Sequence, residues 1–248
     1  WLVNQPQAVL AKGQKAKFSL PTSAVQVSEN LYSLGVAYDK QSGKQVEGYA
    51  IVHRKEGAAK SNRAKTGATA CYGFLAKDAK WKWLEPWVVN PSNTRGLDQT
   101  FVFTNLADDI AKWESAASYN ILGDGMMTAD VLVADTVSPI DNKNEVYFAD
   151  LSDPNTIAVT IIWGIFGGPT FNRKLVEWDM IFDDVTYDWS MSGEAGKMDF
   201  ENIATHELGH SLGLADLYNS NCANETMYGY AAFGETIKRS LNAGDILG

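Results

Sequence analysis

The sequence predicts an α+β fold in which a small, mostly-β N-terminal segment precedes a larger unit of mixed strands and helices. In the second unit, apolar strand-like segments alternate with two helical patterns. Near the start, two apolar-rich segments flank a polar turn, which is typical of a β-hairpin. The charge also changes sign, because residues 1–80 carry a net charge of +7 and residues 81–248 one of −16. We therefore expect two units, divided near residue 80, that attract each other.

The composition excludes several classes of protein. The 248 residues are 45% hydrophobic and 21% charged, which is typical of a globular chain, and the net charge is −9. An acidic chain is a poor partner for nucleic acid or for a polybasic contact with a membrane. No segment approaches 18 consecutive apolar residues, so we expect no membrane span. The chain begins at Trp1 without a charged and apolar leader, from which we expect a processed form.

The first 80 residues contain the predicted hairpin, with strands over 31–38 and 46–53. Residues 57–69 form a small, basic segment rich in Gly, Ala and Lys, for which we expect a flexible loop open to proteolysis. Residues 1–80 are therefore predicted to be either a pro-segment that docks on the acidic body of its own chain and is removed on activation, or a permanent accessory domain.

In the second unit, segments with the periodicity of a helix alternate with short apolar segments typical of strands. Apolar residues at Phe103, Leu106, Ile110 and Trp113 recur at steps of three and four and predict a helix over 103–117. A second helix is expected to begin at Asp199, a good N-cap with Glu201 in the first turn, and to run to Gly213. Strands are expected over 87–89, 129–135, 157–166 and 175–182.

The segment 205–216 carries the chemistry. His206 and His210 are four residues apart on the second helix, so both imidazoles project from one face and can share a zinc ion. Glu207 lies between them and can act as general base toward a water molecule on the metal. Gly213 can adopt the left-handed backbone that ends a helix, and the chain can then present Asp216 as a third ligand. The plainer alternative is an amphipathic helix with two hydrogen-bonded histidines.

This stretch resembles the metzincin zinc metalloproteases, and most closely the matrixin branch. The metzincin pattern is His-Glu-x-x-His-x-x-Gly-x-x-(His or Asp), followed by a turn that contains Met. Most matrixins carry His at the third ligand position, whereas Asp216 resembles the form in snapalysin-like enzymes. The segment 226–230 matches the Met-turn. The resemblance implies that Met227 packs beneath the zinc as a hydrophobic floor and that Tyr228 lines the substrate pocket on the primed side of the scissile bond.

The resemblance further implies a zincin-like catalytic domain over residues 81–248. We expect a twisted mixed β-sheet, a backing helix and an active-site helix, with residues 157–166 as an antiparallel edge strand that pairs with an extended substrate. The implied function is that of a secreted zinc-dependent endopeptidase that cleaves proteins or peptides, and the resemblance allows for synthesis as a zymogen. The alternatives are a non-catalytic protein-binding module that keeps the metzincin fold, and zinc-dependent hydrolysis of a substrate other than a peptide.

The two cysteines, Cys71 and Cys222, allow three interpretations. They form a disulfide, as expected in an oxidising compartment. Alternatively, Cys71 binds the zinc as a thiolate and keeps the enzyme latent, as in matrixin zymogens, although the flanking residues lack the matrixin Pro-Arg-Cys-Gly signature. In the third interpretation they do neither.

Two acidic segments, 124–135 and 141–153, occupy the place of the matrixin loop that binds calcium. The resemblance therefore implies a structural Ca²⁺ site, because Ca²⁺ takes clustered oxygen ligands. A solvated acidic loop is the alternative, and the sequence does not assign individual ligands.

Overall fold

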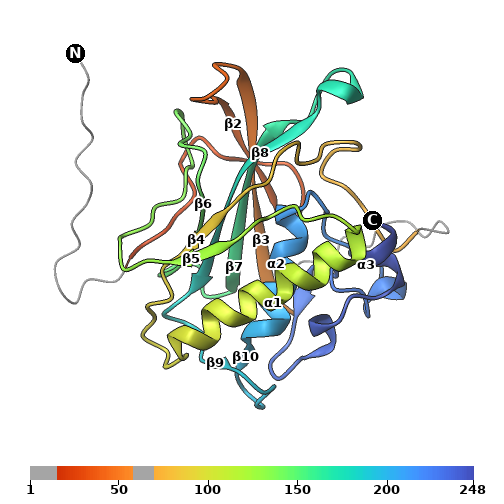
Figure 1. The fold of residues 1–248 in the computed structure, drawn as a ribbon. Helices are drawn as coiled ribbons and strands as arrows, with labels where there is room; N and C mark the ends of the chain where they lie inside the picture. The colour runs from red at the N-terminus through yellow and green to blue at the C-terminus, as the bar shows by residue number, and fades with distance from the viewer. Residues whose placement is uncertain (1–15, 58–69) are drawn as a thin grey trace.

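The computed structural model describes residues 16–57 and 70–248, and its centre is one large sheet with helices on one face (Figure 1). Within the described residues this sheet has nine strands, in the order β1-β2-β3-β7-β8-β6-β4-β5, and β11 also pairs with β3. Pairing is antiparallel from β1 to β8 and parallel from β8 to β5. The mixed α+β class is therefore confirmed.

The strands of this sheet are β1 (Val25–Gln26), β2 (Leu31–Tyr38), β3 (Gln45–Lys55), β4 (Trp87–Val89), β5 (Gly125–Met127), β6 (Asn144–Ala149), β7 (Thr156–Ile165), β8 (Lys174–Asp183) and β11 (Tyr230–Ala231). Two short strands, β9 (Trp189–Ser190) and β10 (Met198–Asp199), pair with each other. The α-helices are α1 (Gln99–Ala117), α2 (Phe200–Ser211) and α3 (Ala243–Leu247), and the short 3-10 helices are η1 (Thr170–Asn172), η2 (Ser220–Cys222) and η3 (Ile237–Arg239).

Helix α1 forms where the apolar periodicity predicts it, but it begins four residues earlier. The Asp98 side chain caps it by accepting a hydrogen bond from the Phe101 backbone N–H at 2.8 Å. Its buried stripe includes Leu106, Ile110 and Trp113, which turn toward α2 and the sheet. The predicted backing helix is thus present.

Helix α2 begins as predicted, with Asp199 as N-cap and Glu201 in the first turn. The Asp199 side chain accepts from the Asn202 N–H at 3.1 Å. The helix ends at Ser211, and Gly213 has a φ of +97°, in the left-handed region that favours glycine. Nearly every residue of α2 is buried, because α1 packs on one side and the sheet on the other.

The sheet separates two apolar cores. Trp178, Met180 and Phe182 of β8 face the helices, together with Leu208 of α2. Ile181 points to the opposite face, as strand alternation requires. That second core also takes side chains from the β2–β3 hairpin. The described part of residues 1–80 therefore adds strands to the common sheet and shares its core.

The predicted hairpin is confirmed as β2 and β3. The predicted loop over 57–69 lies, apart from Gly57, outside the described residues. The expected strand over 129–135 is wrong, and a short strand, β5, precedes it. The backbone N–H groups of Val133, Ala134 and Asp135 donate to side chains, those of Glu145, Tyr147 and Asp179, and not to a neighbouring strand. In this segment, side-chain oxygens therefore take the place of the backbone carbonyls of a neighbouring strand.

Strand β7 corresponds to the segment 157–166, which was expected to be the antiparallel edge strand of residues 81–248. Among the strands that those residues contribute along the sheet, it is indeed the outermost, but β3 of the N-terminal segment covers its outer side. It lies inside the sheet, with β8 on one side and β3 on the other. Apolar residues occupy both faces of the strand, such as Ile162 in one core and Ile161 in the other, so both faces are covered.

Among the described residues, no helix combines the length and the apolar character that a membrane crossing requires.

Candidate metal centre

Helix α2 places two imidazoles side by side. The Nε2 atoms of His206 and His210 are 3.1 Å apart. Each ring donates through Nδ1 to a backbone carbonyl, His206 to Thr226 at 2.6 Å and His210 to Leu214 at 2.9 Å. A carbonyl only accepts hydrogen bonds, so the proton of each neutral ring is on Nδ1. In the neutral form of both rings, the two Nε2 atoms are therefore unprotonated, and they face each other.

Asp216 completes the group from beyond the bend at Gly213. Its Oδ1 atom lies 3.2 Å from His206 Nε2 and 3.4 Å from His210 Nε2. Its other oxygen, Oδ2, accepts from the Tyr218 hydroxyl at 2.7 Å. The loop is held by hydrogen bonds between Leu217 and residues 227 and 229. The structure thus brings together all three residues that the motif singles out.

The charges of this group suit metal ligands. Burial, with the nearby His53, lowers the pKa of His206 to about 4, so its ring is neutral. Burial tends to raise the pKa of Asp216, but the adjacent His210 and His206 outweigh it and hold that pKa well below its usual range. Burial lowers the pKa of His210, and Asp216 offsets this and raises it. The Asp216 carboxylate is thus charged, as a ligand must be.

The three atoms fit a zinc ion. Two unprotonated imidazole nitrogens and a carboxylate oxygen, all acceptors, face one another within 3.1–3.4 Å. Three buried acceptors at this spacing repel one another unless a cation lies among them. Ligands around a tetrahedral Zn²⁺ with bonds of about 2.0–2.1 Å are about 3.3 Å apart. Asp216 Oδ1 also has no hydrogen-bond partner among the described residues.

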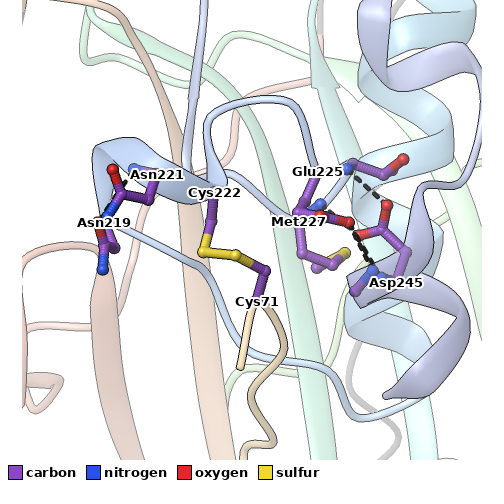
Figure 2. Close-up of a disulfide and its surroundings, with 9 residues drawn as sticks. Cys71, Asn219, Asn221, Cys222, Glu225, Met227 and Asp245 are labelled. Atoms are coloured by element: carbon purple, nitrogen blue, oxygen red, sulfur yellow. Dashed lines mark hydrogen bonds between the residues drawn. A yellow bond between two sulfur atoms is a disulfide. The ribbon is translucent and has the colours of Figure 1, made fainter. Parts of the chain in front are cut away.

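Met227 lies directly against the helix that carries the histidines. A Cβ atom added at Gly209 would be only 2.2 Å from its sulfur and 2.9 Å from the Trp113 ring. Glycine at this position therefore lets the methionine and α1 approach α2 closely. Asp245 of α3 fixes the turn, accepting from the N–H groups of Thr226 at 2.8 Å and Met227 at 3.1 Å (Figure 2).

The structure joins Cys71 to Cys222 by a disulfide, beside the turn that carries Met227 (Figure 2). Its sulfur atoms are therefore not free to bind a metal. The bond connects the end of the N-terminal 80 residues to η2. Tyr228, from the same turn, is half-buried, and its ring centroid lies 5.8 Å from that of Tyr230.

Glu207 is fully buried and both of its oxygens are engaged. Its Oε1 accepts from His53 Nδ1 at 2.8 Å, and its Oε2 accepts from the Thr160 hydroxyl at 2.5 Å. Burial raises the pKa of Glu207. His53 lies on β3, is itself fully buried, and its ring centroid is 4.0 Å from that of His206. The Glu207 carboxylate thus lies next to the candidate metal ligands, but it is hydrogen-bonded to His53 of the N-terminal segment.

Sequence reasoning missed His53, Thr160, Tyr218 and Asp245. The chain has only three histidines, and this scarcity is a signal that could have drawn attention to His53. The other three are common polar residues whose roles depend on contacts between distant segments, and no local pattern marks them.

A second group of acids lies on the face of the sheet opposite the helices. Asp135, Asp141 and Glu177 each offer an oxygen within 4.8 Å of the others. Burial raises the pKa of Asp135 to about 6, and burial followed by the charge of Asp179 raises that of Glu177 to about 10. Glu177 Oε1 is buried and without a hydrogen-bond partner among the described residues. The structure thus brings Asp135 and Asp141, from the two predicted acidic segments, to a residue of β8.

The metal centre is closed. His206, Glu207 and His210 are fully buried, and the Asp216 side chain is 6% exposed. A cleft of about 910 Å³ lies elsewhere, between the segment 77–84 and the end of α1, and none of these residues lines it. Within the part of the chain that the structure describes, these side chains are therefore shielded from an extended peptide in this conformation.

Comparisons with known proteins relate the C-terminal part of the chain to a protein family. Residues 164–248 match the family model for matrixin. No curated protein sequence matches the chain significantly. A crystal structure of metalloproteinase-II from Bacteroides fragilis is similar at 12% sequence identity, over 90% of this chain and 76% of that chain, with a TM-score of 0.35. That TM-score is too low to support an argument, so the assignment rests on the family match.

Proposed function

We propose that this chain is a matrixin-like, zinc-dependent endopeptidase, and the match of residues 164–248 to the matrixin family model supports this. The observation that carries this proposal is the convergence of three unprotonated acceptor atoms within 3.1–3.4 Å on and beside α2. The zinc ligands are His206, His210 and Asp216. Three protein ligands leave a fourth position for water, which is the catalytic pattern.

Other groups of the chain hold these ligands in place. The carbonyls of Thr226 and Leu214 orient the two rings, and the Tyr218 hydroxyl occupies Asp216 Oδ2 so that Oδ1 faces the imidazoles. Met227 forms the floor against Gly209, and Tyr228 lines the primed side of the substrate pocket. When bound, the zinc would act as a Lewis acid and lower the pKa of a coordinated water to about 7.

Glu207 is the general base of the proposed reaction. It accepts the proton of the attacking water and then delivers it to the amine that leaves the cleaved peptide bond. No covalent intermediate with the protein is needed. In this conformation its oxygens accept from His53 and Thr160, so Glu207 can act only after at least one of these contacts is released.

The direct test combines zinc content with casein hydrolysis. We expect one tightly bound zinc per chain, activity lost in Glu207→Gln, and zinc retained in that variant. Glu194→Gln, at an exposed glutamate, is the matched control and should keep both. A chain that binds zinc but hydrolyses no protein or peptide, even after the contacts of Glu207 with His53 and Thr160 are loosened, would instead favour the non-catalytic binding module.

We further propose that the protein is secreted, and that residues 1–80 are a pro-segment docked on residues 81–248. The Cys71–Cys222 disulfide supports an oxidising compartment. The docking is supported by ion pairs between the two parts, Arg54 with Asp153 at 2.6 Å and Lys174 with Asp39 at 3.6 Å. Incubation of the zinc-loaded chain, followed by terminal sequencing over time, tests this. A stable, active, full-length chain would exclude removal.

We also propose a structural Ca²⁺ site formed by Asp135, Asp141 and Glu177. Its support is the carboxylate of Glu177, which is buried among other acids with one oxygen unpartnered in the described structure. Buried carboxylates at this spacing are stabilised by protons or by a cation, and Ca²⁺ takes oxygen ligands of this kind. Calorimetric titration with Ca²⁺ tests the site, which should be lost in Glu177→Gln.

A further inference from the structure

Strand β3 runs between two elements that flank the metal centre. On one side it pairs antiparallel with β7 over eight residue pairs, from Glu47↔Gly164 to Arg54↔Thr156. On the other side, beyond the end of β2, it pairs with β11, which follows the Met227 turn. The Glu56 N–H extends this contact by donating to the Ala231 carbonyl at 2.8 Å. Residues 51–55 of β3, here called the inserted strand, thus have backbone partners on both sides.

The inserted strand brings a side chain into the metal centre. His53 donates to Glu207 at 2.8 Å and its ring lies 4.0 Å from that of His206, measured between centroids. The neighbouring residues hold the strand in place, because Arg54 bonds to Asp153 at 2.6 Å and the Lys55 ammonium lies 4.6 Å from the centroid of the Phe233 ring. A substrate peptide laid along β7 would need this same place.

Strand addition requires a free edge. The backbone of β7 is paired on both sides, and the residues proposed for catalysis are buried beneath the inserted strand. A protein substrate therefore cannot pair with β7 or reach Glu207 while β3 remains in the sheet.

We propose that the inserted strand is the chain's own occupant of its substrate cleft, and that it keeps the enzyme latent by filling the edge of β7 and by tying Glu207 to His53. This inference rests on the proposed endopeptidase function. Residues 51–55 would inhibit the enzyme in place of a zinc-binding cysteine, because the sulfur of Cys71 is part of the disulfide. The alternative is that β3 is a permanent strand and that His53 only positions Glu207.

A reversible staple between β3 and β7 tests the proposal in the full chain. Ala50 and Ile161 face each other across the two strands, and directly opposed residues of an antiparallel pair are close enough for a disulfide. The double variant Ala50→Cys, Ile161→Cys locks β3 in place. Its matched control, Tyr38→Cys with Gln45→Cys, staples β2 to β3 at an exposed pair and leaves the β3–β7 contact unconstrained. Mass spectrometry verifies each disulfide.

A loosened variant provides the opposite change. A Cβ atom at Gly48 would lie 2.4 Å from the buried Trp163 ring, so Gly48→Ala should weaken the contact between β3 and β7. At Gly167 the nearest atom would be 3.7 Å away, so Gly167→Ala is the control for an added methyl group.

Two readouts are measured on zinc-loaded protein. The first is hydrolysis of a quenched fluorogenic peptide, and the second is fluorescence anisotropy of a labelled peptide with the sequence of residues 49–56. We expect Gly48→Ala to raise both by about tenfold relative to Gly167→Ala, and the β3–β7 staple to abolish the rise until a reductant opens it. Wild-type protein given the same reductant controls for loss of the native disulfide. The β2–β3 staple should have no effect.

The proposal is overturned if the β3–β7 staple leaves peptide binding and hydrolysis unchanged in the loosened chain, or if loosening β3 increases neither. Failure of the proposed function looks different. In that case the labelled peptide binds to the loosened chain and is excluded by the staple, but no variant hydrolyses a peptide. A folded state is checked for each variant by hydrogen exchange of the β8 amides, which should stay protected.

Discussion

The hydroxyl of Tyr218 donates to Asp216 Oδ2 at 2.7 Å, while Asp216 Oδ1 faces the two imidazoles. The tyrosine therefore determines which carboxylate oxygen is free. Gly229 makes this contact feasible, because a Cβ atom there would be 2.6 Å from the Tyr218 ring and 3.1 Å from the Asp216 carboxyl. The acidic third ligand thus has an orienting partner of its own.

Replacing Tyr218 by Phe should weaken zinc binding by about 10–100-fold, because a partner that orients a ligand is removed while the ring is kept. Competition with a chromogenic chelator measures the affinity. Tyr119→Phe, at a tyrosine that is 75% exposed, is the matched control. Equal affinities for the two variants would contradict an orienting role.

Gly209→Ala should destabilise the fold by about 1–3 kcal/mol, because the added methyl group would collide with Met227 and with the ring of Trp113. Urea denaturation of the zinc-loaded protein gives the free energy of unfolding. The same substitution at Gly167, where there is space, should change it little. If both variants unfold at the same urea concentration, the close packing of Met227 on α2 is not supported.

The double variant Cys71→Ser, Cys222→Ser should lower the free energy of unfolding by about 2–5 kcal/mol, since the bond closes a loop with a sequence separation of 151 residues. Thermal melting in the absence of reductant measures the loss. Wild-type protein melted in reductant should resemble the variant, and a variant as stable as the oxidised wild type would refute the prediction.

The contribution of the acidic group around Asp135 to stability without Ca²⁺ should fall as the pH rises from about 4 to about 8. Burial raises the pKa of Asp135 to about 6 and that of Glu145 to about 7, from 3.8 and 4.5. The folded chain thus holds protons that the unfolded chain releases, so unfolding becomes easier through this range. We expect Ca²⁺ to raise the melting temperature by several degrees at pH 8 and little at pH 5, relative to a chelator.

The same melting series in Glu177→Gln separates the site from general effects of calcium. The increase at pH 8 should disappear in this variant and persist in Glu194→Gln, which changes an exposed glutamate. A Ca²⁺ effect of equal size in both variants would place the ion elsewhere.

The sequence predicts the arrangement of the candidate metal ligands well where that arrangement is local. One helical turn separates His206 from His210. The bend at Gly213 directs the chain so that Asp216 lies beside the two histidines. The contact of Glu207 with His53 joins residues 154 positions apart and depends on the order of strands in the sheet. Sequence periodicity does not encode that order. The apolar run of β7 is a usable signal that both faces of this strand are covered, but it does not reveal which strand pairs with its outer edge.

The eight residue pairs between β3 and β7 also affect whether the protein self-associates in solution. Without β3, the backbone N–H and C=O groups on that side of β7 would lose their partners, and apolar side chains such as Trp163 would be uncovered. A bare strand of this kind readily joins the same strand of another molecule. An activated form would therefore self-associate as its concentration rises, and an excess of peptide would keep it monomeric.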